Sequence, residues 1–512
     1  MPAEPPEGSA RIPRATYRLQ LHRGFGFDAA VRILPYLRRL GISHVYCSPI
    51  LRARSGSAHG YDVVAHGEIN PELGGRAGFE RFAAALRAQG MGLLLDVVPN
   101  HMGVFSDSNP WWMDVLEHGE ASRHAGYFDI DWHPGDPELD GRLLLPVLGT
   151  PYGQALDQGE LRLAFDPAAG SLALHYHAHR FPLAPRSYAA ILEPAALLAE
   201  NAALADLARA FGHIDAGDVV HTQLLKQWLA ALTGAHRAIQ AAVEVLNAPE
   251  QRDALHALHE LQVYRLAHWR LAADDVNYRR FFDINDLAAL RMELPEVFEA
   301  THGLLLDLAA AGQVDGLRID HPDGLKDPAQ YFERLQQGYA RRAGLAEGAA
   351  GSRPLYVVAE KIAAPHEDVP TGWALHGTTG YRFAMVANGV LVDGDAAEAF
   401  DRIWQWFVAD DTPFGAHVVQ ARREAACRTL ASELGRLAMM LLLIARSDRH
   451  TRDHSLNSLH EALAGIAACM PVYRTYVIDT PSAQDLHLID WAVAQARRRS
   501  RLADLSVFDF VR

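Results

Sequence analysis

GLLLDVVPN (residues 92–100) is an almost wholly apolar segment, whose polar residues are Asp96 in its middle and Asn100 at its end. A strand that is buried on both faces shows such a run, whereas a half-exposed strand alternates apolar and polar side chains. Strands of this kind are typical of parallel sheets covered by helices. The segment therefore predicts a parallel α/β fold with this strand in its interior.

Two shorter strand candidates precede this run, and helical patterns separate the three. TYRLQL (16–21) and HVYCSP (44–49) are the candidates. A helix is expected from Asp28 to Gly41, although Pro35 lies inside it. A second helical pattern, of apolar residues at three- and four-residue spacing, covers 79–86. This alternation predicts three consecutive β/α units.

The next strand of the same type, VDGLRID (314–320), lies far along the chain, so we expect a large insertion after the third strand. Residues 104–190 are rich in Trp, Tyr, His and Pro without periodicity, which indicates an irregular lobe with short strands. Residues 191–275 are rich in Ala and Leu and helical in pattern. The strand–helix alternation then resumes with a helix near 328–343 and the strand LYVVAE (355–360).

Composition narrows the function classes. With 48 basic and 62 acidic residues, the net charge of −14 makes nucleic acid an unexpected partner. The start of the chain has no apolar signal region, and the strongest apolar run, 437–445, is too short to span a bilayer and is expected to be a buried helix. Three cysteines without metal-type spacing predict neither a disulfide framework nor a zinc site. A cytoplasmic protein with no membrane association fits these features.

Polar residues close the strand VDGLRID. Arg318 and Asp320 share one strand face, and the carboxylate lies at the carboxyl end, where parallel barrels place catalysis. Asp320 alone could equally be a helix cap or a solvated turn residue. The neighbouring Arg318 favours an ionised, nucleophilic carboxylate, because a nearby cation stabilises the charged form.

Glu360 closes the apolar strand LYVVAE in the same way. Such a carboxylate is either a salt-bridge partner or a group with a raised pKa. Two carboxylates at the ends of consecutive parallel strands face each other, and retaining glycosidases need a separation of roughly 5–5.5 Å. Asp320 and Glu360 are therefore candidates for nucleophile and general acid/base.

Further polar residues are expected around this pair. Asp96 and Asn100 alternate on the 92–100 strand, and His101 follows it. A lone His is commonly structural, but four polar side chains near this strand end favour substrate hydrogen bonding. HGYD (59–62) adds a ring and a carboxylate: Tyr61 could be a surface residue, yet aromatic faces stack on pyranose rings in sugar sites.

DVVPNH, GLRIDHPDG and VVAEKI are similar, in this order, to the first three signature regions of the α-amylase superfamily, glycoside hydrolase family 13. Five further segments resemble one branch of it, the maltooligosyltrehalose synthases, over residues 12 to 512. They are TYRLQLHRGFGFDAA, SPILRARSGSAHGYDVV, LLLPVLGTPYG, NYRRFFDINDLAALRME and MPVYRTYV.

The resemblance implies roles for individual residues. Asp320 would be the nucleophile and Glu360 the general acid/base, while Asp96 would hold Arg318. The remaining substrate-binding residues that it implies are Tyr61, Asp62, Asn100, His101, Arg318, His321 and Lys361. Neither a cofactor nor a metal is implied. The fourth signature region of the superfamily supplies a His-Asp pair, and this chain contains no His-Asp dipeptide.

The resemblance also implies a (β/α)8 TIM barrel, here incomplete, with an irregular and helical insertion after strand 3 and a helical insertion after strand 6. The expected segments are 1–103 with barrel strands 1–3, the inserted lobe 104–275, 276–394 with strands 4–6, and 395–512, helical and returning toward the barrel. The final barrel strands and a C-terminal sheet domain are expected to be absent.

The implied reaction turns the reducing-end α-1,4 bond of a maltooligosaccharide or linear α-1,4-glucan into an α,α-1,1 bond, the work of an isomerase in trehalose synthesis. A maltooligosyltrehalose trehalohydrolase is the functional partner that this implies. The alternatives are an α-glucan hydrolase, an inactive glucan-binding fragment, and a metal-dependent barrel enzyme. The last would use His101, Asp320, His321 and Glu360 as ligands, but no paired ligand spacing supports it.

Overall fold

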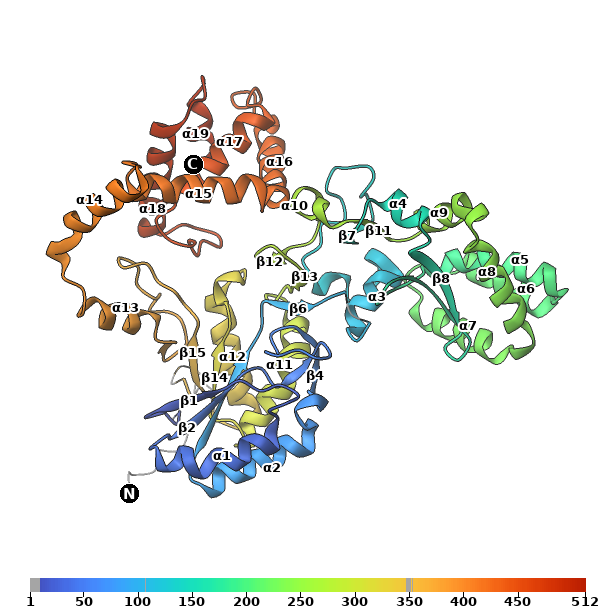
Figure 1. Cartoon of the computed structure of the whole chain (residues 1–512), viewed down its shortest axis with the longest axis horizontal. Helices are drawn as coiled ribbons and strands as arrows, with labels where there is room; N and C mark the ends of the chain where they lie inside the picture. The colour runs from blue at the N-terminus through green and yellow to red at the C-terminus, as the bar shows by residue number, and fades with distance from the viewer. Residues whose placement is uncertain (1–9, 106, 347–350, 352) are drawn as a thin grey trace. The chain divides into compact units, whose positions relative to one another are not determined.

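The computed structural model describes residues 10–105, 107–346, 351 and 353–512, and these form two compact units (Figure 1). Unit 1 contains the residues up to Ile50, Pro71–Asn100 and Phe298–Arg512. Unit 2 contains Leu51–Asn70 and His101–Val297.

Unit 1 is built on a six-stranded parallel sheet whose strand order follows the chain. This topology, with helices between successive strands from β1 to β15, confirms the predicted α/β fold of TIM-barrel type. All six residues of the third strand are buried, as its apolar run predicts. The strands, in order, are β1 (Thr16–Leu19), β2 (His44–Cys47), β5 (Gly92–Val97), β14 (Gly316–Ile319), β15 (Tyr356–Ala359) and β16 (Gly377–Thr378).

Helices follow the strands of this sheet. The first two pack side by side through the buried rings of Phe27, Phe79 and Phe82 (Figure 1). Pro35 lies inside the first helix, which nevertheless ends only at Arg39. The helices are α1 (Phe27–Arg39), α2 (Gly75–Ala88), α11 (Pro295–Ala310), α12 (Pro328–Arg342), α13 (Tyr381–Gly389), α14 (Ala397–Val408), α15 (Phe414–Arg428), α16 (Ala431–Ser447), α17 (Leu456–Cys469), α18 (Ala483–Arg499) and α19 (Ser506–Val511).

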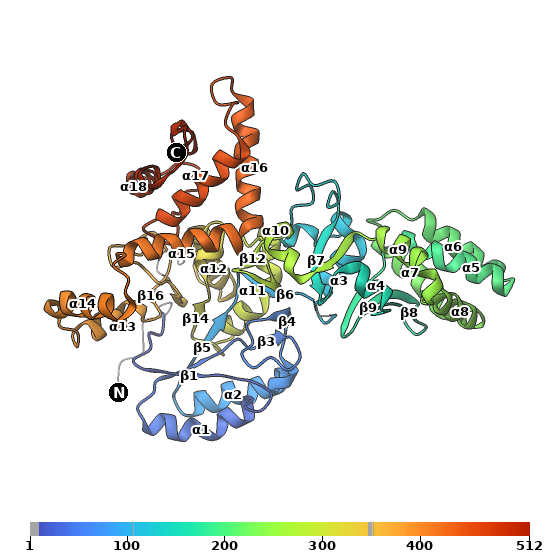
Figure 2. The same cartoon turned by 45° about the horizontal axis from the view of Figure 1, so that its top comes forward.

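The apolar run 437–445 belongs to α16, which packs beside α17 (Figure 2). Ala438, Leu442 and Ala445 are buried, whereas Met440 and Leu443 are 60% and 62% exposed. The prediction of a buried helix was wrong for the face that carries Met440 and Leu443. Apolar content predicts a helix here, but only one face of this helix meets its neighbour.

Unit 2 combines small sheets with a group of helices. Its strands are β3 (Leu51–Ala53), β4 (Val63–Ile69), β6 (His101–Gly103), β7 (Leu143–Leu148), β8 (Leu161–Asp166), β9 (Ser171–Tyr176), β10 (His179–Pro182), β11 (Tyr264–His268), β12 (Arg280–Phe281) and β13 (Ile284–Ala289). Its helices are α3 (Pro110–His118), α4 (Tyr152–Asp157), α5 (Ala189–Ala199), α6 (Ala202–His213), α7 (Val219–Ala231), α8 (His236–Leu246), α9 (Arg252–Glu260) and α10 (Ala272–Asp275).

The compact units divide the chain at other places than the expected segments. Residues 51–70 and 276–297, expected with the barrel strands, fall in unit 2. Backbone pairing is the physical reason for the second of these, since β13 pairs antiparallel with both β12 and β6. The four expected segments therefore stay a prediction.

In the part of the chain that the structure describes, none of the helices is both long and apolar enough to cross a membrane.

Candidate active site

Three charged side chains meet where β5 and β14 end. The register pairs Arg318 with Asp96, so that both point to the same face of the sheet. The Arg318 Nη1 donates hydrogen bonds of 2.7 Å to Asp96 Oδ1 and 2.7 Å to Asp320 Oδ1. The Tyr46 hydroxyl on β2 donates to Asp96 Oδ2 at 2.5 Å. Asp96 therefore holds Arg318, as the resemblance implied.

Glu360 joins the same cluster from the end of β15. Its Oε2 lies 3.0 Å from Arg318 Nη2 and accepts a hydrogen bond of 3.2 Å from the backbone N–H of His321. Its Oε1 accepts a hydrogen bond of 3.1 Å from the Tyr381 hydroxyl. One guanidinium thus contacts both candidate catalytic carboxylates, one at each terminal nitrogen.

Burial controls the electrostatics of this cluster. Asp320 is only 7% exposed, and its pKa is raised to about 7, because burial, together with the nearby charges of Asp96 and Glu360, outweighs the lowering by Arg318. The sequence predicted that Arg318 favours the ionised form of Asp320; Arg318 does lower this pKa, although burial raises it more, and the nucleophilic role of Asp320 stays a prediction. Burial, and then Glu360, also raise the pKa of Tyr381.

Lys361 lies beside the carboxylate cluster but turns into the protein. Its side chain is fully buried, and Nζ forms ion pairs of 3.0 Å with Asp323 and 2.8 Å with Glu367. The Tyr476 hydroxyl donates to Asp323 from the other side. The predicted contact between Lys361 and substrate is not supported by this geometry, which instead ties the loop after β15 to the loop after β14.

Two further predicted residues lie next to the pair. His321 takes a left-handed backbone conformation (φ 42°), and its ring stands edge-on to Tyr473 with centroids 5.9 Å apart. Asn100 is buried in the loop after β5, which ends at Val97 rather than at Asn100. Both side chains are brought to the region of Asp320, and their contact with substrate stays a prediction.

The other predicted residues belong to unit 2. His101 opens β6, is fully buried and packs on Phe281 with ring centroids 4.4 Å apart, a contact that favours a structural role. Tyr61 lies 5.9 Å from the ring of His59. Asp62 accepts a hydrogen bond of 2.6 Å from the Ser57 hydroxyl. Substrate contacts for these three stay predictions.

Tyr46, Tyr381 and the Asp323–Tyr476 contact were missed by sequence reasoning. Tyr381 is separated by 21 residues from Glu360, and only the fold brings them together. The segment MPVYRTYV was noted for its resemblance, but nothing in it indicated that Tyr476 reaches Asp323. Among the described residues, no group of three or more His, Cys, Asp or Glu side chains is arranged to hold a metal ion.

Comparisons with known proteins agree on one family of enzymes. Residues 29–152 match the family described as "Alpha amylase, catalytic domain". A "Putative maltooligosyl trehalose synthase" from Mycobacterium tuberculosis is 34% identical over 94% of this chain and 53% of its own length. The chain spans about half the length of the curated relatives it matches.

Solved structures show the same relationship. Maltooligosyltrehalose synthase from Arthrobacter ramosus superposes with a TM-score of 0.71 at 33% identity, over 97% of this chain and 52% of that one. A hypothetical maltooligosyl trehalose synthase from Sulfolobus tokodaii gives a TM-score of 0.66 at 25% identity, over 98% and 54%.

Proposed function

We propose that this chain converts the α-1,4 bond at the reducing end of a maltooligosaccharide into an α,α-1,1 bond. Its match to the α-amylase catalytic domain and its similarity to the maltooligosyl trehalose synthases support this proposal. The observation that carries the proposal is the shared contact of Asp320 and Glu360 with Arg318. This contact holds two carboxylates close together at neighbouring strand ends, the arrangement that a retaining double displacement needs.

The first half-reaction breaks the bond to the terminal glucose. The Glu360 carboxyl donates its proton to the glycosidic oxygen while an Asp320 oxygen forms an ester with the anomeric carbon. Arg318 lies against both groups and stabilises the carboxylate charge that moves from Asp320 to Glu360. The products are a glycosyl-enzyme and a glucose that remains bound.

The second half-reaction reverses the roles. The Glu360 carboxylate accepts the proton of the anomeric hydroxyl of that glucose, whose oxygen attacks the glycosyl carbon as the ester to Asp320 breaks. Attack from the same face creates the α,α-1,1 bond. No water is consumed, so the net change is an isomerisation.

An α-glucan hydrolase is the second candidate, because it would use the same carboxylates with water as the acceptor. Proton NMR of maltohexaose incubated with the purified chain separates the readings. We expect the reducing-end anomeric signals to fall as the 1,1 signal grows. Free glucose forming faster than the 1,1 product would assign a hydrolase, and an unchanged spectrum would overturn catalysis by this chain.

The proposed reaction also implies a partner enzyme and a cellular compartment. The product has no reducing end, so a maltooligosyltrehalose trehalohydrolase acting on the 1,1-linked product would complete trehalose release. The three cysteines are free, two of them buried, which supports a reducing cytoplasm as the site of the reaction.

A further inference from the structure

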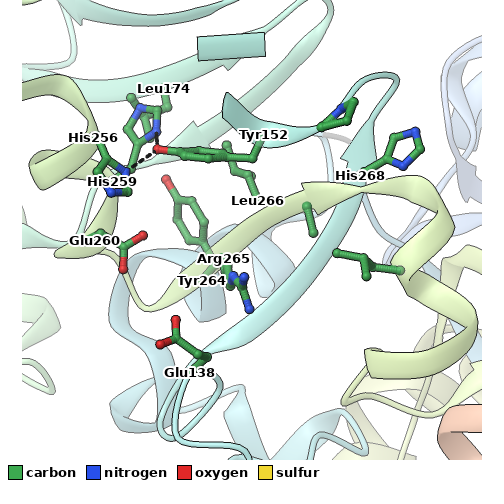
Figure 3. Close-up of a pocket in the computed structure, with 13 residues that line it drawn as sticks. Glu138, Tyr152, Leu174, His256, His259, Glu260, Tyr264, Arg265, Leu266 and His268 are labelled. Carbon is green, nitrogen blue, oxygen red and sulfur yellow. Dashed lines mark hydrogen bonds between the residues drawn. The ribbon is translucent and has the colours of Figure 1, made fainter. Parts of the chain in front are cut away.

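A cavity of about 510 Å³ opens in unit 2, and every residue that lines it belongs to that unit (Figure 3). Its walls come from α4, α9 and all five residues of β11. Pockets of roughly 300–1,000 Å³ accept small ligands. The cavity contributes nothing to the carboxylate cluster of unit 1, and its chemistry therefore needs a separate explanation.

One wall is a hydrogen-bonded group of three rings. The Tyr152 hydroxyl lies 2.9 Å from Nδ1 of His256 and 2.9 Å from Nδ1 of His259 (Figure 3). A hydroxyl has one proton, so it donates to one imidazole and accepts from the other. Both Nδ1 atoms are thus committed to Tyr152, and burial lowers the pKa of His259 to about 4, which keeps that ring neutral at pH 7.

The charged groups of the cavity are nearly balanced. Glu260 accepts a hydrogen bond of 2.9 Å from Arg142, so its charge is compensated. Glu138 and Arg265 supply one negative and one positive group to the lining. A polyanion finds no excess of cations here. Within the described part of the chain, no group of three or more His, Cys, Asp or Glu side chains is arranged to hold a metal ion. The wall is therefore suited to a neutral ligand with many hydrogen-bonding groups.

The rest of the surface is apolar. The ring of Tyr264 lies beneath that of Tyr152, and Leu266 borders both in Figure 3. Aromatic rings with carboxylate and guanidinium groups around them bind pyranoses, since a sugar has apolar C–H faces and an equatorial belt of hydroxyls. Neither a metal nor an anion explains all of these residues together.

We propose that this cavity is a second carbohydrate-binding site, which holds a short segment of α-1,4-linked glucan against Tyr152, Glu138 and Arg265, with the buried ring of Tyr264 supporting the wall. The choice of glucan rests on the function proposed above, whereas the choice of a neutral sugar rests on the cavity itself. A site of this kind raises the time that a long glucan spends on the protein without taking part in the bond exchange.

Two probes without a reducing end separate this site from the reaction: β-cyclodextrin and maltoheptaitol. Titration calorimetry of the full chain should show binding of at least one of them. Arg265→Ala should weaken that binding about tenfold, as expected for loss of a hydrogen bond to a charged group. Glu138→Gln, at an exposed position, tests the same site without risk to the fold.

The matched controls are Arg237→Ala, at an exposed arginine of α8, and Glu360→Gln in the catalytic pair. Both should leave the affinity for the probes unchanged. The proposal is overturned if neither probe binds, or if binding survives both cavity variants. It is also overturned if Glu360→Gln alone abolishes binding, which would place the probe at the catalytic carboxylates.

The maltohexaose spectrum is an independent readout of the reaction. The chain could bind a probe in a way that depends on Arg265 and yet leave maltohexaose unchanged. This result would support the sugar site and refute the proposed reaction. Conversion of maltohexaose without probe binding would do the reverse.

Discussion

Replacement of Asp320 by Asn should make the chain more stable at pH 8 while it removes activity. Asp320 is 7% exposed and has a pKa of about 7 in the folded chain, against 3.8 for the free side chain. Because the folded state binds this proton more tightly than the unfolded chain does, the stability that it contributes is fully present below pH 3.8. That stability is lost as the pH rises through about 7.

The size of the effect follows from the two pKa values. At about 1.4 kcal/mol for each unit between them, ionising Asp320 inside the fold costs about 4 kcal/mol at pH 8. An Asn side chain has the same shape and no charge, but it replaces a charge-assisted bond to Arg318 with a weaker one. We therefore expect the Asn variant to be about 2–3 kcal/mol more stable at pH 8, and equal to the original chain near pH 4.

Urea unfolding followed by circular dichroism at pH 4, 6 and 8 measures this difference. Asp401→Asn, at an exposed carboxylate of α14, is the matched control and should change stability little at any pH. An Asp320→Asn variant that is equally or less stable than the original at pH 8 would refute the reasoning, since Arg318 would then outweigh burial. Turnover of maltohexaose should fall at least about 1,000-fold in the variant.

Three other substitutions test the surroundings of the pair. Tyr381→Phe removes the hydrogen bond to Glu360 and should lower kcat about tenfold with little change in KM; an unchanged kcat in steady-state assays would count against this contact. Lys361→Met leaves the buried carboxylates of Asp323 and Glu367 without their cation, so it should lower the free energy of unfolding in urea titrations by about 3–5 kcal/mol. A loss below about 1 kcal/mol would contradict this prediction. Gly324→Ala places a Cβ too close to Asn100 Oδ1 and should displace the loop that follows β5, which would reduce kcat/KM. The prediction fails if kcat/KM and the thermal midpoint are both unchanged.

Much of the fold in unit 1 could be predicted because its signals are local. A strand buried on both faces is a nearly continuous apolar run, and β5 shows one that only Asp96 interrupts. The helix from Asp28 was predicted through Pro35 and is observed from Phe27 to Arg39. The strand β11 was missed, because five residues at the end of a helical region carry too short a pattern to distinguish strand from helix.

In the candidate site, too, some contacts could be predicted from local sequence and others could not. Arg318 and Asp320 share a strand face by simple alternation, so their proximity is a property of sequence. Lys361 was expected to bind substrate from the resemblance, and no local pattern indicated its ion pair with Asp323, which is 38 residues away and belongs to another loop. Tyr381 carried no local signal at all.

The sequence by itself determined the parallel α/β architecture and the position of Asp320 and Glu360 at neighbouring strand ends, because strand periodicity and strand-end position are set by near neighbours in the chain. Only the tertiary structure decided which face of α16 is buried, that Lys361 points inward, and that burial raises the pKa of Asp320. Each of these depends on how much water and which charges surround a group, and both are set by residues distant in sequence.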